Sequence, residues 1–262
     1  MALPPLKVGI DADDTLWPHF GEVIARIGTL CDPPAVLGEK DCTGFYDWPA
    51  LRGLKLQAGL RMRDGRTTQG GESITRNFKE KGPGMLTVYD FLEPDLYADR
   101  KPYPEAPAAV AAIAAMPGVE AYCVTAHPMS VLKTPDDPDR LRLETHKLRL
   151  NKEFFPGLKG TVFTRDKARQ GLDVLIDDGG DHNLRPFLEA AAREGRPALA
   201  LHMNRPWNVG EEIPGARRIY DMAEAVPLIA RFREEHFAAA RRSVPVPEID
   251  IPAKPKTPER IG

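Results

Sequence analysis

The sequence contains few cysteines, no long apolar run and no excess of positive charge. Its three cysteines form no Cys-x-x-Cys pair and cannot all be joined in disulfides, which argues against a zinc knuckle and favours a reducing compartment. No uninterrupted apolar stretch reaches the length of a membrane span, and the first residues lack a basic segment followed by an apolar core. We therefore expect a cytoplasmic protein without a membrane partner.

The charge balance also limits the class of partner. The 262 residues carry a formal net charge of −2, and lysines and arginines are scattered along the chain. Such a chain has no basic field with which to hold a nucleic-acid polymer. With 42% hydrophobic residues it can bury a substantial core, and its length fits one large domain or one domain with a smaller insert.

Short apolar runs alternate with helical patterns over residues 6–16 and about 104–235. Strands separated by helices of this length predict a parallel sheet that is covered on both faces, an open α/β fold. The expected strands are 7–11, 119–125, 160–164, 172–178 and 197–203, and the expected helices are 104–116, 137–155 and 183–195.

The remaining segments differ in composition. Residues 18–100 are rich in Gly, Arg and aromatic side chains and lack the short apolar runs of a sheet, so we expect a small, mainly helical insert. It interrupts a catalytic core that we assign to residues 1–17 and 101–240. The last segment, 241–262, has a proline every few positions and is expected to be a disordered or extended tail.

Polar side chains gather where the predicted strands end. Ligands of open parallel sheets bind beyond the carboxyl ends of the strands, so these side chains should converge. A cluster of four carboxylates, one hydroxyl and one ammonium suits a hard divalent cation, Mg²⁺, and a bound phosphate. The residues are Asp11, Asp13, Thr125, Lys167, Asp177 and Asp178.

The two aspartates after the first strand predict phosphoryl transfer. The carboxylate of Asp11 could attack a phosphorus atom and form an aspartyl-phosphate. Asp13, two residues further on, could protonate the departing alcohol and then take a proton from the hydrolytic water. Asp14 faces the other way on the strand period and is expected to be a local cap or hydrogen-bond partner.

The other strand-end residues supply phosphate and metal contacts. We expect the hydroxyl of Thr125 and the ammonium of Lys167 to bind the phosphate, together with backbone N–H groups after the strand, such as that of Ala126. Asp177 would complete the metal shell. Asp178 would not bind the metal directly. It would orient either Lys167 or the water that binds the metal.

The four motifs, in this order, resemble those of the haloacid dehalogenase superfamily of phosphohydrolases. They are "IDADDTL" at 10–16, the strand-terminal Thr125, Lys167, and the pair Asp177 and Asp178. The block "FTRDKARQGLDVLIDD" is similar to that of the 5'(3')-deoxyribonucleotidases, with lysine ten residues before the first aspartate. The resemblance covers about residues 6–230 and includes "GFYDW", "YADRKPYPEA", "ETHKLRLNKEFF" and "RPWN".

This resemblance implies a Rossmann-like three-layer sandwich with a parallel sheet and a small helical cap of the C1 type. It implies Mg²⁺ as cofactor, bound by the carboxylates of Asp11 and Asp177 and by the backbone carbonyl of Asp13. The implied substrate is a small phosphate monoester, a nucleoside monophosphate. The implied substrate-binding residues are His19 or Phe20 after the nucleophile, Phe45 and Tyr46 in the cap, His127 and Lys147.

Two departures from the deoxyribonucleotidase pattern lie where the nucleoside would be recognised. The chain has "WPHF" where the family has a phenylalanine, and Ala126 followed by His127 replaces a small hydroxyl residue. Lys147 is in a basic helix, so a solvated position is an equal alternative.

Three questions stay open at this point. A phosphatase of a sugar or cofactor phosphate is the runner-up, and a non-catalytic receiver-like or phospho-ligand-binding protein is the alternative of another class. The identity of the nucleotide, its phosphate position and the preference for ribose or deoxyribose are not encoded in these motifs. A homodimer and a monomer are equally compatible with the sequence.

Overall fold

The computed structural model describes residues 4–45, 47–76, 79, 81–91, 98–126 and 137–243. Its centre is a six-stranded sheet in the order β10-β9-β8-β1-β6-β7, with every neighbouring pair parallel. The strands are β1 (Leu6–Ile10), β6 (Val119–Thr125), β7 (Thr161–Phe163), β8 (Val174–Asp177), β9 (Leu199–Met203) and β10 (Ala216–Ile219). The predicted parallel α/β fold is confirmed.

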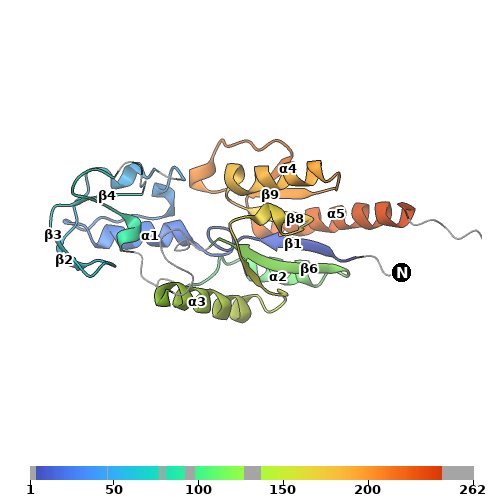
Figure 1. Ribbon diagram of the computed structural model, residues 1–262, viewed down its shortest axis with the longest axis horizontal. Coiled ribbons are helices and arrows are strands. Elements are labelled where there is room, and N and C mark those ends of the chain that lie inside the picture. The colour runs from blue at the N-terminus through green and yellow to red at the C-terminus, as the bar shows by residue number, and fades with distance from the viewer. Residues whose placement is uncertain are drawn as a thin grey trace, which may run out of the picture.

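Helices cover both faces of this sheet (Figure 1). They are α2 (Ala106–Ala114), α3 (Pro138–Phe154), α4 (Arg185–Arg193) and α5 (Met222–Ser243). On one face Leu6 of β1 belongs to a buried cluster with Ile113 of α2 and Ile229 of α5. On the other face Leu175 of β8 packs in a second cluster with Phe187 of α4. Near-continuous apolar strands therefore result from burial on both faces.

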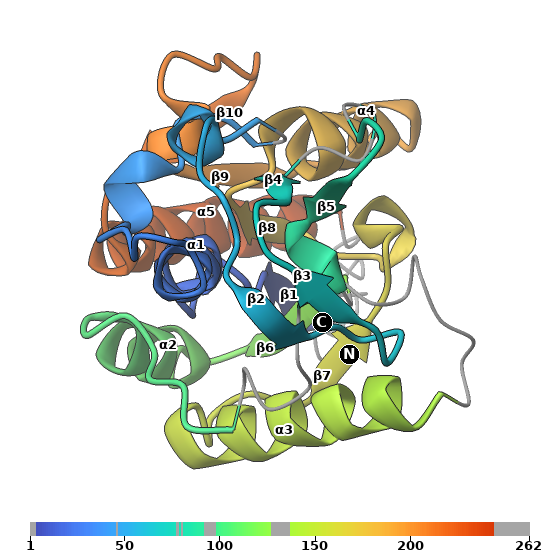
Figure 2. The ribbon, with the colours of Figure 1, turned by 90° about the vertical axis from the view of Figure 1, so that its left-hand side faces the viewer.

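The described part of the insert, residues 18–100, lies beyond the carboxyl ends of the strands, at the left of Figure 1 and in front of the sheet in Figure 2. It contains α1 (His19–Thr29), several single 3₁₀ turns and four strands paired as β2-β3 and β4-β5. These strands are β2 (Ala58–Arg61), β3 (Thr67–Gln69), β4 (Ser73–Thr75) and β5 (Met85–Thr87).

The insert is therefore less helical than the sequence predicted. Its strands have only three or four residues, and β2 and β3 are largely exposed. Strands this short and polar do not show the alternation of apolar residues by which a strand is recognised in a sequence.

Two further expectations concern the cysteines and the tail. Cys31, Cys42 and Cys123 are free and buried, as expected for small apolar side chains in a core. Helix α5 continues to Ser243, so the first residues of the predicted tail are helical, and the rest of the tail lies outside the described residues. Among the described helices, none combines the length and the apolar character needed to cross a membrane.

Candidate active site

The carboxyl ends of β1, β6 and β8 lie at one edge of the sheet and bring the predicted strand-end residues together. The backbone N–H of Asp11 donates to the carbonyl of Ile176 at 2.9 Å, which joins the end of β1 to the end of β8. Thr125 ends β6 on the other side of β1. All of this follows from the strand order, because parallel strands present the same end to the same edge.

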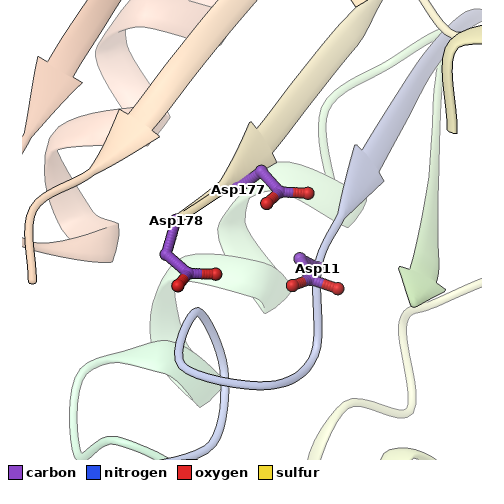
Figure 3. A group of neighbouring side chains, drawn as sticks. All are labelled: Asp11, Asp177 and Asp178. Carbon is purple, nitrogen blue, oxygen red and sulfur yellow. The ribbon is translucent and has the colours of Figure 1, made fainter. Parts of the chain in front are cut away.

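Three buried carboxylates converge at this edge. Asp11, Asp177 and Asp178 each place one carboxylate oxygen within 4.8 Å of the others (Figure 3). Their exposed fractions are 7%, 0% and 5%. Such a group is stable only when cations or hydrogen-bond donors compensate the charge.

Lys167 supplies the first compensation. Its ammonium lies 2.7 Å from Oδ1 of Asp11 and 2.6 Å from Oδ2 of Asp177. Burial alone would lower the pKa of Lys167, but the two carboxylates raise it above its usual value. Burial also raises the pKa of Asp11 to about 7, and Lys167 opposes that rise. One ammonium is therefore shared by two carboxylates and does not neutralise the cluster.

The two adjacent aspartates after β8 have different surroundings. Both oxygens of Asp177 already accept hydrogen bonds, Oδ2 from Lys167 and Oδ1 from the N–H of Gly179 at 2.8 Å and the amide of Asn183 at 2.9 Å. Asp178 accepts one bond at Oδ2, from the indole N–H of Trp207 at 2.8 Å, and it lines the central cavity. Burial first, and then neighbouring carboxylates, raise the pKa of Asp178 well above its usual value.

Asp13 is held by a separate set of cations. The ammonium of Lys147 lies 2.7 Å from its Oδ2, and the guanidinium of Arg100 lies 3.9 Å from its Oδ1. Burial would raise the pKa of Asp13, but Lys147, with His19 and Arg100, lowers it below its usual range. Asp13 is thus an ionised carboxylate in the protein without a ligand.

Lys147 is buried, with an exposed fraction of 2%, so the alternative of a solvated position is wrong. Its ammonium also donates to Oγ1 of Thr125 at 3.4 Å. Helix α3 buries Leu143, Lys147, Leu150 and Asn151, a stripe with helical spacing. That stripe is the sequence signal by which an inward-facing lysine could have been found.

The predicted role of Asp14 as a local cap is confirmed, but the expectation that it faces away from the site is wrong, because Asp14 also lines the cavity. Its Oδ1 accepts the backbone N–H groups of His19 at 2.7 Å and Phe20 at 2.8 Å, at the start of α1. The residue has a φ of 62°, a left-handed conformation that aspartate tolerates better than most residues. The guanidinium of Arg205 holds its backbone carbonyl at 2.5 Å. Asp14 thereby fixes the turn that carries the neighbouring Asp13.

A cavity of about 450 Å³ lies between this edge and the insert. The core contributes predicted residues to its wall, namely Asp11, Asp13, Thr125, Ala126, Lys167 and Asp178. The insert contributes His19, Phe20 and Phe45, which were also predicted. Tyr46 and His127 lie outside the described residues.

Aromatic rings form the insert side of this cavity. The ring of Phe20 lies 5.6 Å from that of Phe45, 5.2 Å from Trp48 and 4.8 Å from Trp207, measured between centroids. Trp17, which precedes them in the sequence, packs edge-on against Phe155 in the core instead. Phe20 and Phe45 therefore belong to the wall of the cavity, and the guanidinium of Arg76 already lies over the ring of Phe20 at 4.7 Å.

His19 lines the cavity, and it also contacts Arg100. Its Nδ1 lies 3.2 Å from the guanidinium of Arg100, an arrangement in which neutral imidazole accepts the hydrogen bond. Burial lowers the pKa of His19 to about 3. Asp13 opposes this fall, whereas the cations Arg100 and Lys147 add to it. Arg100 is further held by Glu22, at 2.7 Å. His19 and Glu22 thus position the cation next to Asp13.

Sequence reasoning missed several residues that line the cavity or support its acidic cluster. They are Arg76, Tyr89, Arg100, Arg165, His182, Asn183 and Trp207. Trp207 stands in the "RPWN" segment that the resemblance includes, so it carried a signal. Arg76 and Tyr89 belong to the insert, where no motif marks them and only the folded chain brings them to the site.

Comparisons with known proteins are distant. No family model and no curated protein matches the chain. Among solved structures it is similar to a haloacid dehalogenase-like family hydrolase from Xanthomonas campestris, with 16% identity, a TM-score of 0.44, and coverage of 92% of this chain and 100% of that one. It is also similar to the putative HAD-hydrolase YfnB from Bacillus subtilis bound to magnesium, with 13% identity, a TM-score of 0.47, and coverage of 87% and 99%.

Proposed function

We propose that this protein is an Mg²⁺-dependent phosphomonoesterase that acts through an aspartyl-phosphate on Asp11. The observation that carries the proposal is the separate electrostatic support of two aspartates in one turn. Asp11 shares Lys167 with Asp177, whereas Asp13 has its own partner, Lys147. Two neighbouring carboxylates held by different cations can take different roles, one as nucleophile and the other as acid/base.

The chain's own residues would carry the chemical steps. A carboxylate oxygen of Asp11 attacks the phosphorus atom, and the bond from phosphorus to the alcohol oxygen breaks. Asp13 delivers a proton to that oxygen, and the negative charge of the bound substrate is what raises its pKa enough to hold this proton. Asp13 then takes a proton from the water that attacks the phosphorus, which releases inorganic phosphate and restores Asp11.

The donor set of the acidic cluster fits Mg²⁺. Carboxylate oxygens are the hard ligands that this ion prefers, and Lys167 compensates only part of their charge. The resemblance implies Asp11, Asp177 and the backbone carbonyl of Asp13 as ligands, and Asp178 also belongs to the cluster that could hold an ion. We propose Asp178 in place of Asp177, because Asp178 lines the cavity and both oxygens of Asp177 already accept hydrogen bonds. Asp177, whose oxygens are already bonded, would hold Lys167. When bound, the ion would neutralise charge on the phosphoryl oxygens.

The proposed substrate is a nucleoside monophosphate or another small phosphate monoester. The cavity of about 450 Å³ has the size of a small-molecule site, and the rings of Phe20 and Phe45 belong to its wall. Thr125 and the backbone at Ala126 would hold phosphate oxygens beside Lys167. A sugar or cofactor phosphate is the runner-up, because the same phosphate-binding residues would serve it.

Release of phosphate from an aryl phosphate, with and without Mg²⁺, tests this proposal. We expect activity that chelation of the metal removes, and loss of at least about 10³-fold in kcat for Asp11→Asn. Asp64→Asn is the matched control, because Asp64 is paired with Arg66 on the surface of the insert. Absence of phosphate release, or full activity of Asp11→Asn, would overturn the proposal and favour a non-catalytic phospho-ligand-binding protein.

The substrate class requires a separate measurement. A panel of 5'- and 3'-monophosphates, ribo and deoxy, would be compared by kcat/KM with sugar phosphates. A nucleotidase should prefer the nucleotides by at least about tenfold, the effect of one stacked base. Phe45→Ala should reduce that preference and leave hydrolysis of the aryl phosphate nearly unchanged.

A further inference from the structure

Arg76 is a buried cation in the wall of the cavity. It follows β4 in the insert and has an exposed fraction of 6%. Its guanidinium carbon lies 4.7 Å from the ring centroid of Phe20, 5.2 Å from that of Trp48 and 4.8 Å from that of Tyr89. Three rings therefore enclose the guanidinium and hold its plane in place.

Among the described residues, no acidic side chain matches the charge of Arg76. One nitrogen, Nη1, donates to the hydroxyl of Tyr89, and Nε is buried without a hydrogen-bond partner. Within the described part of the chain no carboxylate lies at ion-pair distance from it. A buried guanidinium with only a neutral acceptor is costly, unless a ligand supplies the missing charge.

Other buried arginines of this chain differ from Arg76. Arg100 lies 2.7 Å from the carboxylate of Glu22. Arg205 donates to the backbone carbonyl of Asp14 at 2.5 Å while its guanidinium stacks on Tyr103 at 4.0 Å. These two guanidinium groups serve the protein itself, and neither lines the cavity. Arg76 both lines the cavity and keeps donor capacity for something inside it.

Arg76 and the acidic cluster line the same cavity from different parts of the chain. The aspartates lie at the ends of β1 and β8, whereas Arg76 follows β4 of the insert, a strand that stands in front of the sheet in Figure 2. A ligand that lies between the two walls would have one end at the phosphate-binding edge and the other at Arg76. The planar fork of a guanidinium suits a carboxylate or phosphate at that second end.

We propose that Arg76 binds a second anionic group of the substrate, so that the preferred substrates are phosphate monoesters that carry a carboxylate or another phosphate. Nucleoside bisphosphates and phosphorylated acids are the members of this class that the cavity would take. The inference rests on the proposed phosphatase function for the phosphate end of the ligand. It makes Arg76 a specificity-determining residue of that site.

Substrate pairs that differ in one anionic group test the inference. Nucleoside 3',5'-bisphosphate would be compared with the 5'-monophosphate, and 6-phosphogluconate with glucose 6-phosphate. In at least one pair, the wild type should prefer the member with the additional anionic group by about ten- to one-hundredfold in kcat/KM, the effect of one charge-assisted contact. Arg76→Gln should abolish that preference, Arg76→Lys should retain part of it, and aryl phosphate hydrolysis should persist in both.

Arg66→Gln is the matched control, because this arginine of the same insert is exposed and already paired with Asp64. It should leave every ratio unchanged. A wild type that hydrolyses aryl phosphate but shows no preference in any pair would overturn the inference and leave the phosphatase proposal intact. The same preference in Arg76→Gln would also overturn it, because the anion would then be held elsewhere.

A binding measurement keeps the inference testable without turnover. Phosphonoacetate, 3-phosphonopropionate and 4-phosphonobutyrate present a phosphonate and a carboxylate at increasing separation, and methylphosphonate lacks the carboxylate. Calorimetry with Mg²⁺ present would measure the affinities. At least one of the three should bind to wild type about tenfold more tightly than methylphosphonate does, and this difference should be absent in Arg76→Gln. Equal binding of all four by wild type would contradict the role of Arg76, even if the protein proved inactive.

Discussion

Replacing Lys147 by methionine removes the cation that lies 2.7 Å from Asp13 and keeps most of the volume of the side chain. Arg100, at 3.9 Å from the other oxygen of Asp13, would remain. The side chain of Lys147 is 2% exposed and that of Asp13 16%, so solvent screens the pair weakly. Loss of one partner of a buried ion pair costs about 3–5 kcal/mol, and the remaining Arg100 favours the lower end.

Chemical denaturation would measure this cost. We expect Lys147→Met to lower the free energy of unfolding by about 3 kcal/mol, and the matched control Lys152→Met, an exposed position of α3, to change it by less than about 0.5 kcal/mol. Hydrolysis should slow as well, because the methionine variant no longer holds Asp13 as the ionised, positioned base. A loss of about 10²-fold in kcat corresponds to the lower limit for general acid/base catalysis.

A double-mutant cycle separates the ion pair from the packing of the methylene chain. In an Asp13→Asn background the lysine has no carboxylate to neutralise, so the same Lys147→Met change should cost less than about 1 kcal/mol. If Lys147→Met destabilised the Asp13→Asn protein as much as the wild type, the pairing would not be the reason for the burial of Lys147. Our account of the acid/base aspartate would then lose its electrostatic basis.

Three further predictions concern the turn and the acidic cluster. Asp14→Ala should lower the free energy of unfolding by about 1–3 kcal/mol in urea denaturation, because α1 loses the acceptor of two N–H groups and alanine disfavours a φ of 62°, whereas Asp14→Asn should cost less. The pKa of His19 is about 3 in the folded protein and about 6.5 in the unfolded chain. Between these values only the unfolded state binds its proton, so the free energy of unfolding falls as pH decreases. His19→Asn should reduce the slope of the free energy of unfolding against pH by up to about 1.4 kcal/mol per pH unit. Trp207→Phe removes the donor to Asp178 and should weaken Mg²⁺ binding by about tenfold or more, measured as the metal concentration that protects against unfolding.

Each of these has a contrary outcome. Equal stability of Asp14→Ala and wild type would show that the turn does not depend on the cap. An unchanged pH slope in His19→Asn would mean that His19 is protonated in the folded protein. Unaltered protection by Mg²⁺ in Trp207→Phe would remove Asp178 from the metal site.

The core of the site could be predicted because it depends on strand order alone. Asp11, Thr125 and Asp177 each stand at the end of an apolar run, and parallel pairing of those runs brings them to one edge whatever the details of packing. The spacing of Lys167 from Asp177 likewise marked this lysine as a site residue. In the structure its ammonium contacts the carboxylates of Asp11 and Asp177. The strand period gave the wrong side for Asp14, because β1 ends at Ile10 and Asp14 lies in the following turn, where it both caps α1 and lines the cavity.

The rest could not be predicted because it depends on contacts between distant segments. Arg76 reaches the cavity only because the short strands of the insert fold over the sheet, and their sequences lack a strand pattern. Lys147 was ambiguous in a helix rich in charge, although its place in the apolar stripe with Leu143 and Leu150 was a usable signal. The choice between Asp177 and Asp178 as the residue facing the cavity depends on Trp207, Asn183 and Gly179, which are hydrogen-bond partners that spacing does not reveal.

The central claim is that Asp11 becomes phosphorylated, and mass spectrometry of acid-quenched protein tests it most directly. Asp13→Asn should slow hydrolysis of the intermediate more than its formation from a good aryl leaving group, so the phosphorylated protein should accumulate in that variant. The account predicts a phosphoryl group on the peptide that contains Asp11, and none in a protein that also carries Asp11→Asn. Rapid phosphate release by the wild type, with no covalent phosphate on this peptide in either protein, would contradict it.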